Sequence, residues 1–195
     1  KDIQGDTLAK PDSTDNPSGD KKAELNKNAS EDKRASDNLN ASSIGIIKKL
    51  VSSGFEKTSG RNIDTIIIHS SYDAIGSNPF NLDGLIKEYK SYGVSPHYLI
   101  DRSGSIYQLV EEKNIAYHAG ESRIPNGKSG VNNFSIGIEL MNTKDGFFTE
   151  RQYDSLKNLL KYIKGRYIIK HILGHSQIAP GRKDDPWNFD WEKIK

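Results

Sequence analysis

The stretch DTIIIH, residues 64–69, decides the fold class. It holds four consecutive β-branched residues, and so short an apolar run predicts a strand buried inside a sheet. Further strands are predicted at residues 134–141, with the sequence FSIGIELM, and at residues 168–173. Residues 97–100 and 105–110 predict a hairpin, because a polar, glycine-containing turn separates two apolar runs.

Helical patterns lie between these strands. Residues 81–92 place apolar side chains on one helical face, with Asn81 as a possible cap and Gly93 just beyond the end. Residues 149–163 carry a longer apolar stripe, and Thr149 with Gln152 forms a capping box. Apolar spacing at residues 44–51 predicts a short lead-in helix. Together the patterns predict an α/β protein with a central mixed β-sheet flanked by helices.

Residues 1–42 differ in composition from the rest of the chain. They are rich in Asp, Lys, Ser and Asn, and contain no aromatic residue. Such a segment buries too little apolar area to offset the entropy lost on ordering. We therefore predict two parts, a disordered polar tether over residues 1–42 and one folded domain over residues 43–195.

Composition excludes several classes of function. The formal net charge is only +2 and no long basic run occurs, so we expect no nucleic-acid partner. There is no cysteine, which excludes disulfides, thiolate metal sites and a cysteine nucleophile. No apolar run is long enough for a transmembrane segment. The sequence begins at Lys1, as expected for either a removed signal segment or a trimmed chain.

Two histidines lie where predicted strands end. His69 ends the run at 64–69, and His175 begins a loop with the sequence HSQIAPGRKDDPW. A catalytic zinc ion needs three protein ligands and an open position. The two imidazoles and either Asp184 or Asp185 would supply them. The alternative is that the histidines are structural and the aspartates form a polar turn.

A helical His-x-x-x-His zinc motif at His171 and His175 is rejected. That motif needs a glutamate directly after the first histidine, where this chain has Ile172, and Gly174 disfavours a helix interior.

Glu139 is the one acid on an otherwise apolar predicted strand. A carboxylate there is costly unless it is paired or faces a site, so Glu139 is a candidate general base. A solvent-facing glutamate at the strand end is the alternative.

Five segments, over roughly residues 62–191, together resemble the type 2 N-acetylmuramoyl-L-alanine amidase family, which shares its fold with peptidoglycan recognition proteins. They are IIIHS at 66–70, VSPHYLI at 94–100, YHAG at 117–120, NFSIGIE at 133–139 and GHSQIAPGRKDDP at 174–186. The resemblance implies a Zn²⁺ ion held by His69, His175 and Asp185, because the family's aspartate directly precedes the proline. It also implies Glu139 as general base and Lys183 as the group that stabilises the oxyanion.

The resemblance further implies hydrolysis of the amide bond between N-acetylmuramic acid and L-alanine in peptidoglycan or muropeptides. Candidate substrate contacts are His118, Asn133 and Arg182. We expect a monomeric, extracytoplasmic enzyme. Two other classes remain as alternatives: a wall-binding module without catalysis, and an unrelated metal hydrolase such as a peptidase.

Overall fold

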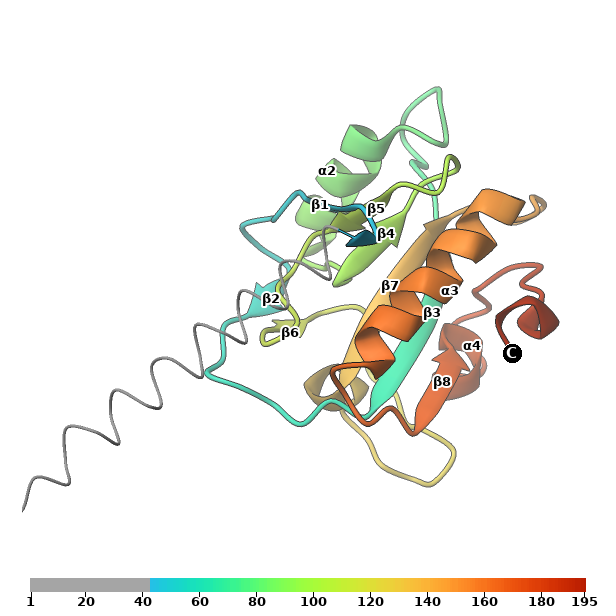
Figure 1. Cartoon of the computed structure of the whole chain (residues 1–195). Coiled ribbons are helices and arrows are strands. Elements are labelled where there is room, and N and C mark those ends of the chain that lie inside the picture. The colour runs from blue at the N-terminus through green and yellow to red at the C-terminus, as the bar shows by residue number, and fades with distance from the viewer. Residues whose placement is uncertain (1–42) are drawn as a thin grey trace, which may run out of the picture. The chain divides into compact units, whose positions relative to one another are not determined.

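The computed structural model describes residues 43–195 (Figure 1). The strands are β1 (Ile46–Lys48), β2 (Phe55–Glu56), β3 (Thr65–Ser71), β4 (Tyr98–Ile100), β5 (Ile106–Gln108), β6 (Ile115–Ala116), β7 (Ser135–Met141) and β8 (His171–Gly174). The helices are α2 (Leu82–Tyr92), α3 (Glu150–Lys164) and α4 (His175–Ile178), with 3-10 turns η1 (Val131–Phe134) and η2 (Trp191–Ile194). The tether predicted for residues 1–42 lies outside the described residues.

Six strands form one sheet in the order β1-β5-β4-β7-β3-β8. The sheet is mixed, as the sequence predicts. β3 and β7 are parallel over seven residue pairs, and only the predicted β4–β5 hairpin is antiparallel. β2 and β6 form a separate two-stranded sheet that the sequence analysis missed. β3 extends two residues past His69, so His69 lies within the strand and not at its end.

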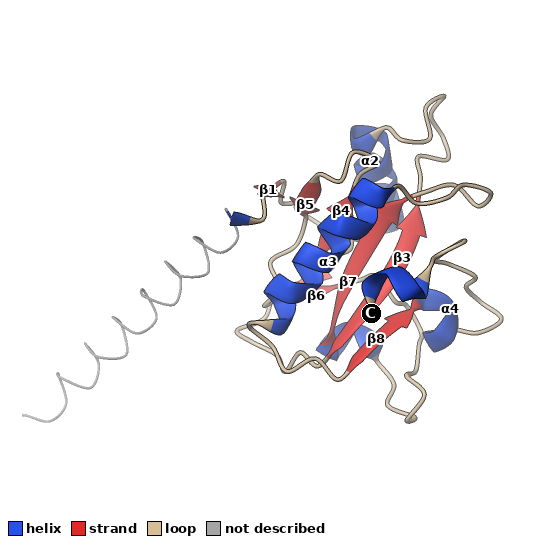
Figure 2. Cartoon of the chain, turned by 45° about the vertical axis from the view of Figure 1, so that its right-hand side comes forward, coloured by secondary structure: helices blue, strands red, loops and turns tan. Residues whose placement is uncertain are grey.

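The side chains on the two faces of β3 pack in two different hydrophobic clusters. Ile66 and Ile68 pack with the buried stripe of α3, which lies across one face of the sheet (Figure 2). Ile67 packs with Phe134 and Ile178 on the opposite face. Because side chains alternate along a strand, His69 shares the face of Ile67. The histidine therefore projects away from α3.

Both predicted helices are confirmed, together with their caps. Asn81 accepts a hydrogen bond from the Gly84 amide at the start of α2, and Gly93 ends the helix with a φ of 66°. The left-handed conformation at the end of a helix favours glycine. Thr149 and Gln152 form the predicted capping box of α3. These local signals set the helix ends, and the buried apolar faces fix the helices on the sheet.

The helix predicted at residues 44–51 is wrong. The structure has the short strand β1 there, paired in parallel with β5. Ile44 and Ile46 pack against the core, whereas the next residue of β1, Ile47, is 46% exposed. Leu50, which the predicted helical stripe would bury, is 53% exposed. The alternation of partly buried Ile46 and exposed Ile47 fits a strand. In an apolar run this short, the sequence alone does not distinguish helical periodicity from strand periodicity. The backbone of this segment forms hydrogen bonds with β5 and the residues that follow it. The sequence pattern did not reveal this pairing.

Leu159 on α3 should carry a large share of the core stability. Its side chain is fully buried between helix and sheet. Leu159→Ala should lower the free energy of unfolding by about 2–5 kcal/mol, through lost burial and the cavity left behind. Urea denaturation measures this change, with the exposed Asn158→Ala on the same helix as control. Equal effects of the two substitutions would contradict the assigned core.

No helix within residues 43–195 is long and apolar enough to cross a membrane.

Candidate metal and catalytic site

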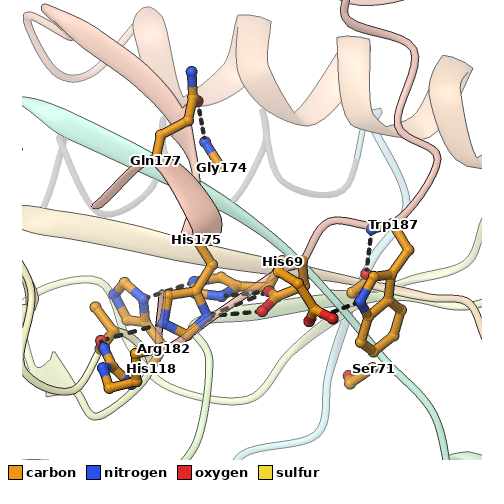
Figure 3. Close-up of polar contacts among 12 residues, drawn as sticks. His69, Ser71, His118, Gly174, His175, Gln177, Arg182 and Trp187 are labelled. Carbon is orange, nitrogen blue, oxygen red and sulfur yellow. Dashed lines mark hydrogen bonds and ion pairs between the residues drawn. The ribbon is translucent and has the colours of Figure 1, made fainter. Parts of the chain in front are cut away.

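Two histidines and one aspartate converge on the face of the sheet opposite α3. His69 comes from β3, His175 is the first residue of α4, and Asp185 lies in the loop that follows. The Nδ1 atom of His175 is 3.1 Å from Asp185 Oδ1, and that of His69 is 3.4 Å from Asp185 Oδ2. The three residues are buried, and each offers a potential ligand atom within 4.8 Å of the others (Figure 3).

The outer nitrogens of both rings have partners of their own. His69 Nε2 lies 3.0 Å from His118 Nδ1, and His175 Nε2 lies 3.2 Å from the Ala119 carbonyl oxygen. Such contacts behind a ligand fix the orientation of an imidazole and select its tautomer. The YHAG segment therefore holds both rings with Nδ1 turned toward Asp185.

The protonation states suit a divalent cation. Burial lowers the pKa of His69 to about 4, so its imidazole is neutral at pH 7. Burial would raise the pKa of Asp185, but hydrogen bonds with His175 and His69 outweigh it and hold that pKa well below its usual range. A neutral imidazole and an ionised carboxylate are the forms in which these groups bind metal ions.

Glu139 lies beside this cluster on β7, in register with His69. Its side chain is buried, and the oxygen Oε2 has no hydrogen-bond partner. Burial, followed by the negative charge of Asp185, raises the pKa of Glu139 to about 8. A cation at the cluster would lower this pKa, because positive charge favours the ionised form. An unpaired buried carboxylate oxygen next to a cavity is suited to accept a proton.

A cavity of about 600 Å³ opens over the cluster. Its lining includes His118, Glu139, Arg182, Lys183 and the potential ligands His175 and Asp185. Lys183 is exposed, and its positive charge acts to lower the pKa of both Glu139 and His69. The cavity therefore combines a metal-type cluster, an acid and an ammonium group.

The structure separates the two aspartates that spacing alone left open. Asp185 belongs to the cluster. Asp184 is exposed and accepts hydrogen bonds from Trp187 Nε1, at 2.9 Å, and from Lys144 Nζ, at 3.1 Å. His171 lies on β8, half-buried and outside the cluster, which confirms that His171 and His175 are not a helical zinc motif.

The predicted substrate contacts divide into two groups. His118 and Arg182 line the cavity, and Arg182 Nη2 donates to the carbonyl oxygens of Ala119 and Glu121. Asn133 is exposed on η1 and does not line the cavity, so the expectation that it contacts substrate there gains no support. Its neighbour Asn132 does line the cavity.

Asn132 was missed although it organises the site. Its Oδ1 accepts hydrogen bonds from the amides of His118, at 3.2 Å, and Ala119, at 2.9 Å. Those two residues are the partners of the cluster histidines, so Asn132 supports the cluster indirectly. Adjacent asparagines on a 3-10 turn point in different directions, and composition alone does not show which one faces inward.

Fold and site together define the class: a mixed α/β protein whose described residues, 43–195, hold one metal-type centre arranged for hydrolysis. Residues 59–188 match the family model described as N-acetylmuramoyl-L-alanine amidase. The chain therefore belongs to the N-acetylmuramoyl-L-alanine amidase family, which confirms the resemblance and the fold class predicted from the sequence.

The named relatives of this chain are amidases of the same kind. The chain is 45% identical over 104 residues to the 1,6-anhydro-N-acetylmuramyl-L-alanine amidase AmpD of Haemophilus influenzae, covering 51% of this chain and 56% of the relative. It is 34% identical over 151 residues to the N-acetylmuramoyl-L-alanine amidase AmiD of Escherichia coli, covering 68% of this chain and 52% of that protein. The chain thus spans about half the length of the curated relatives it matches.

Solved structures show the same fold. A crystal structure of a selenomethionine AmpD derivative has a TM-score of 0.63 and 30% identity, covering 75% of this chain and 92% of that one. E. coli AmiD has been solved in complex with the substrate anhydro-N-acetylmuramic acid-L-Ala-D-gamma-Glu-L-Lys. That complex has a TM-score of 0.59 and 29% identity, covering 72% of this chain and 64% of that one.

Proposed function

We propose that this chain hydrolyses the amide bond between N-acetylmuramic acid and L-alanine in peptidoglycan or in soluble muropeptides. The observation that carries the proposal is Glu139, a buried acid with one unpaired carboxylate oxygen that lines the cavity together with members of the His-His-Asp cluster. A wall-binding module would need neither the cluster nor a buried acid. The names and the bound substrate of the relatives give the bond that is cut.

Zn²⁺ fits the donor set. His69, His175 and Asp185 would hold it through two imidazole nitrogens and a carboxylate oxygen, a combination that zinc accepts in catalytic sites. Three protein ligands leave a position open, and the cavity reaches His175 and Asp185. When bound, zinc supplies Lewis-acid polarisation of the substrate carbonyl and makes water more acidic.

The remaining chemistry belongs to two side chains. Glu139 takes the proton of the attacking water and passes it to the departing L-alanine nitrogen, a role worth roughly 10²–10⁴-fold in rate. Lys183 places an ammonium group in the same cavity, where it stabilises the negative charge that develops on the carbonyl oxygen. His118 and Arg182 contact the substrate on the side of the cavity that they line.

Product analysis tests the reaction directly. Purified sacculi and a soluble muropeptide are incubated with the zinc-loaded protein, and the products are identified by mass spectrometry. The expected products are free stem peptides with an L-alanine amino terminus and N-acetylmuramic acid residues whose lactyl carboxylate is free. Cleavage inside the peptide would instead assign a peptidase, and binding without any product would assign a wall-binding module.

We also propose a monomeric enzyme in an extracytoplasmic compartment. The support for the location is the wall polymer as substrate and the absence of cysteine, which suits an oxidising environment. Cell fractionation and light scattering of the purified protein test the location and the oligomeric state.

Residues 43–195 should suffice for folding and chemistry. The support is the polar composition of residues 1–42, which hold no aromatic residue, and the family match, which lies within residues 59–188. We expect a chain that begins at Ser43 to keep its melting temperature and its activity on soluble muropeptides. Calorimetry and a muropeptide assay measure both quantities. A large loss of either would contradict the proposed division into a tether and a domain.

A further inference from the structure

We propose that Trp187 and Tyr72 form a platform that binds a sugar ring of the substrate. The inference rests on the proposed amidase function and assigns the orientation of the substrate in the cavity. Both aromatic residues line the cavity and are half-buried. Their ring centroids are 6.0 Å apart, and the ring planes are inclined by 59°. The two rings therefore place neighbouring aromatic surface at the cavity wall.

The indole of Trp187 is held in place before any ligand arrives. Its Nε1 donates to Asp184 Oδ1 at 2.9 Å, and its backbone amide donates to Ser70 Oγ at 3.1 Å. Asp184 is in turn paired with Lys144, whose Nζ lies 5.7 Å from the centre of the indole ring. A ring that is already ordered loses little conformational entropy when a ligand packs on it.

Trp187 of the platform and Arg182 lie on opposite sides of the cluster histidines in Figure 3. Figure 3 shows His69 and His175 between the indole of Trp187 on one side and His118 and Arg182 on the other. A substrate whose scissile bond lies at the cluster must extend in both directions. One direction therefore receives the sugar, and the other receives the peptide.

The chemistry of the two sides decides between these orientations. Arg182 is exposed and positively charged, and an arginine side chain can bind the carboxylates that a stem peptide carries. On the platform side, Lys144 and Asp184 form an ion pair that carries no net charge. The surface there consists of the aromatic rings of the platform with this polar pair at their edge. The C–H bonds of a pyranose ring pack on such faces, while its hydroxyl groups find hydrogen-bonding partners at the edge. This neutral ion pair offers a peptide carboxylate no net positive charge to bind.

Tyr117 is the aromatic residue that would serve the reverse orientation. It also lines the cavity, is 39% exposed, and comes directly before His118, which Figure 3 shows on the Arg182 side. If the sugar bound there, Tyr117 would stack on it and Trp187 would not. Tyr117→Ala is therefore a matched control for Trp187→Ala.

The test compares two ligands that share the same tripeptide. One carries N-acetylmuramic acid, and the other carries only the lactyl group, which keeps the scissile amide but lacks the sugar ring. Calorimetry measures dissociation constants for both ligands in the full-length zinc-loaded protein with Glu139→Gln, and kcat/KM is measured with Glu139 intact. The binding measurement does not depend on turnover, so a failure of the amidase proposal and a failure of the platform are distinguishable.

Trp187→Ala should weaken binding of the sugar-containing ligand about tenfold, as expected for the loss of one aromatic packing contact, and should leave the lactyl peptide unchanged. Tyr72→Ala should give a loss of the same kind, and Trp187→Phe should restore part of the affinity. Tyr72→Ala also serves if Trp187→Ala fails to fold. Equal losses on both ligands, or a sugar-dependent loss at Tyr117→Ala instead, would overturn the proposal.

Discussion

Replacing His69 by alanine should remove the bound zinc and reduce the amidase rate to near the uncatalysed background. His69 supplies one of the three potential ligand atoms that converge between β3 and α4. Two remaining ligands hold a zinc ion far more weakly, and both proposed functions of the metal are lost with it. Metal analysis of the purified variant, together with muropeptide turnover, measures the effect. We expect one zinc ion per chain in the parent protein and a small fraction of that in the variant.

His171 offers a matched control for this substitution. It lies on the neighbouring strand β8 and is half-buried, but it lies outside the cluster. His171→Ala should therefore keep its zinc and most of its activity. A zinc content in His69→Ala equal to that of the parent protein would show that the ion binds elsewhere.

Local patterns predicted the parts of the fold that local physics controls. The β-branched run of β3 and the capped stripe of α3 appear in the structure where the sequence placed them. β1 was mistaken for a helix because its strand character comes from pairing with β5, sixty residues further along the chain. β2 and β6 are two residues each, and such short strands form only through their partner.

The site likewise contains residues that local sequence identifies and residues that only the folded structure identifies. His69, His175 and Glu139 stand out because each is polar beside an apolar run. Spacing did not distinguish Asp185 from Asp184, since the direction of adjacent side chains depends on the loop as folded. Asn132 and Asn133 posed the same problem on η1. In both pairs the decisive information is the three-dimensional position of the cavity.

Replacing Glu139 by glutamine should lower the turnover number by about 10²-fold or more, while zinc content and folding stay intact. Glutamine keeps the size of the side chain but cannot accept the proton of the attacking water. With a pKa of about 8, Glu139 is largely protonated at pH 7 when no cation is bound, so the neutral glutamine amide changes the charge there little. The metal-free variant should therefore unfold at nearly the same temperature as the metal-free parent protein. Stopped assays with a soluble muropeptide measure turnover, and metal analysis with thermal unfolding provides the controls.

The pH profile separates the general base from the oxyanion-stabilising group. Burial and the charge of Asp185 raise the pKa of Glu139 to about 8, and a bound cation lowers it again. The base acts only when ionised, so kcat/KM of the parent enzyme should fall as the pH drops through the pKa of Glu139, at a value below about 8. Glu139→Gln should lose this acid limb. Lys183→Ala should slow turnover at every pH but keep the limb, because it removes only positive charge near the developing oxyanion. Near-normal turnover of Glu139→Gln with its zinc in place would rule out the proposed role of Glu139, even if the products still identified an amidase.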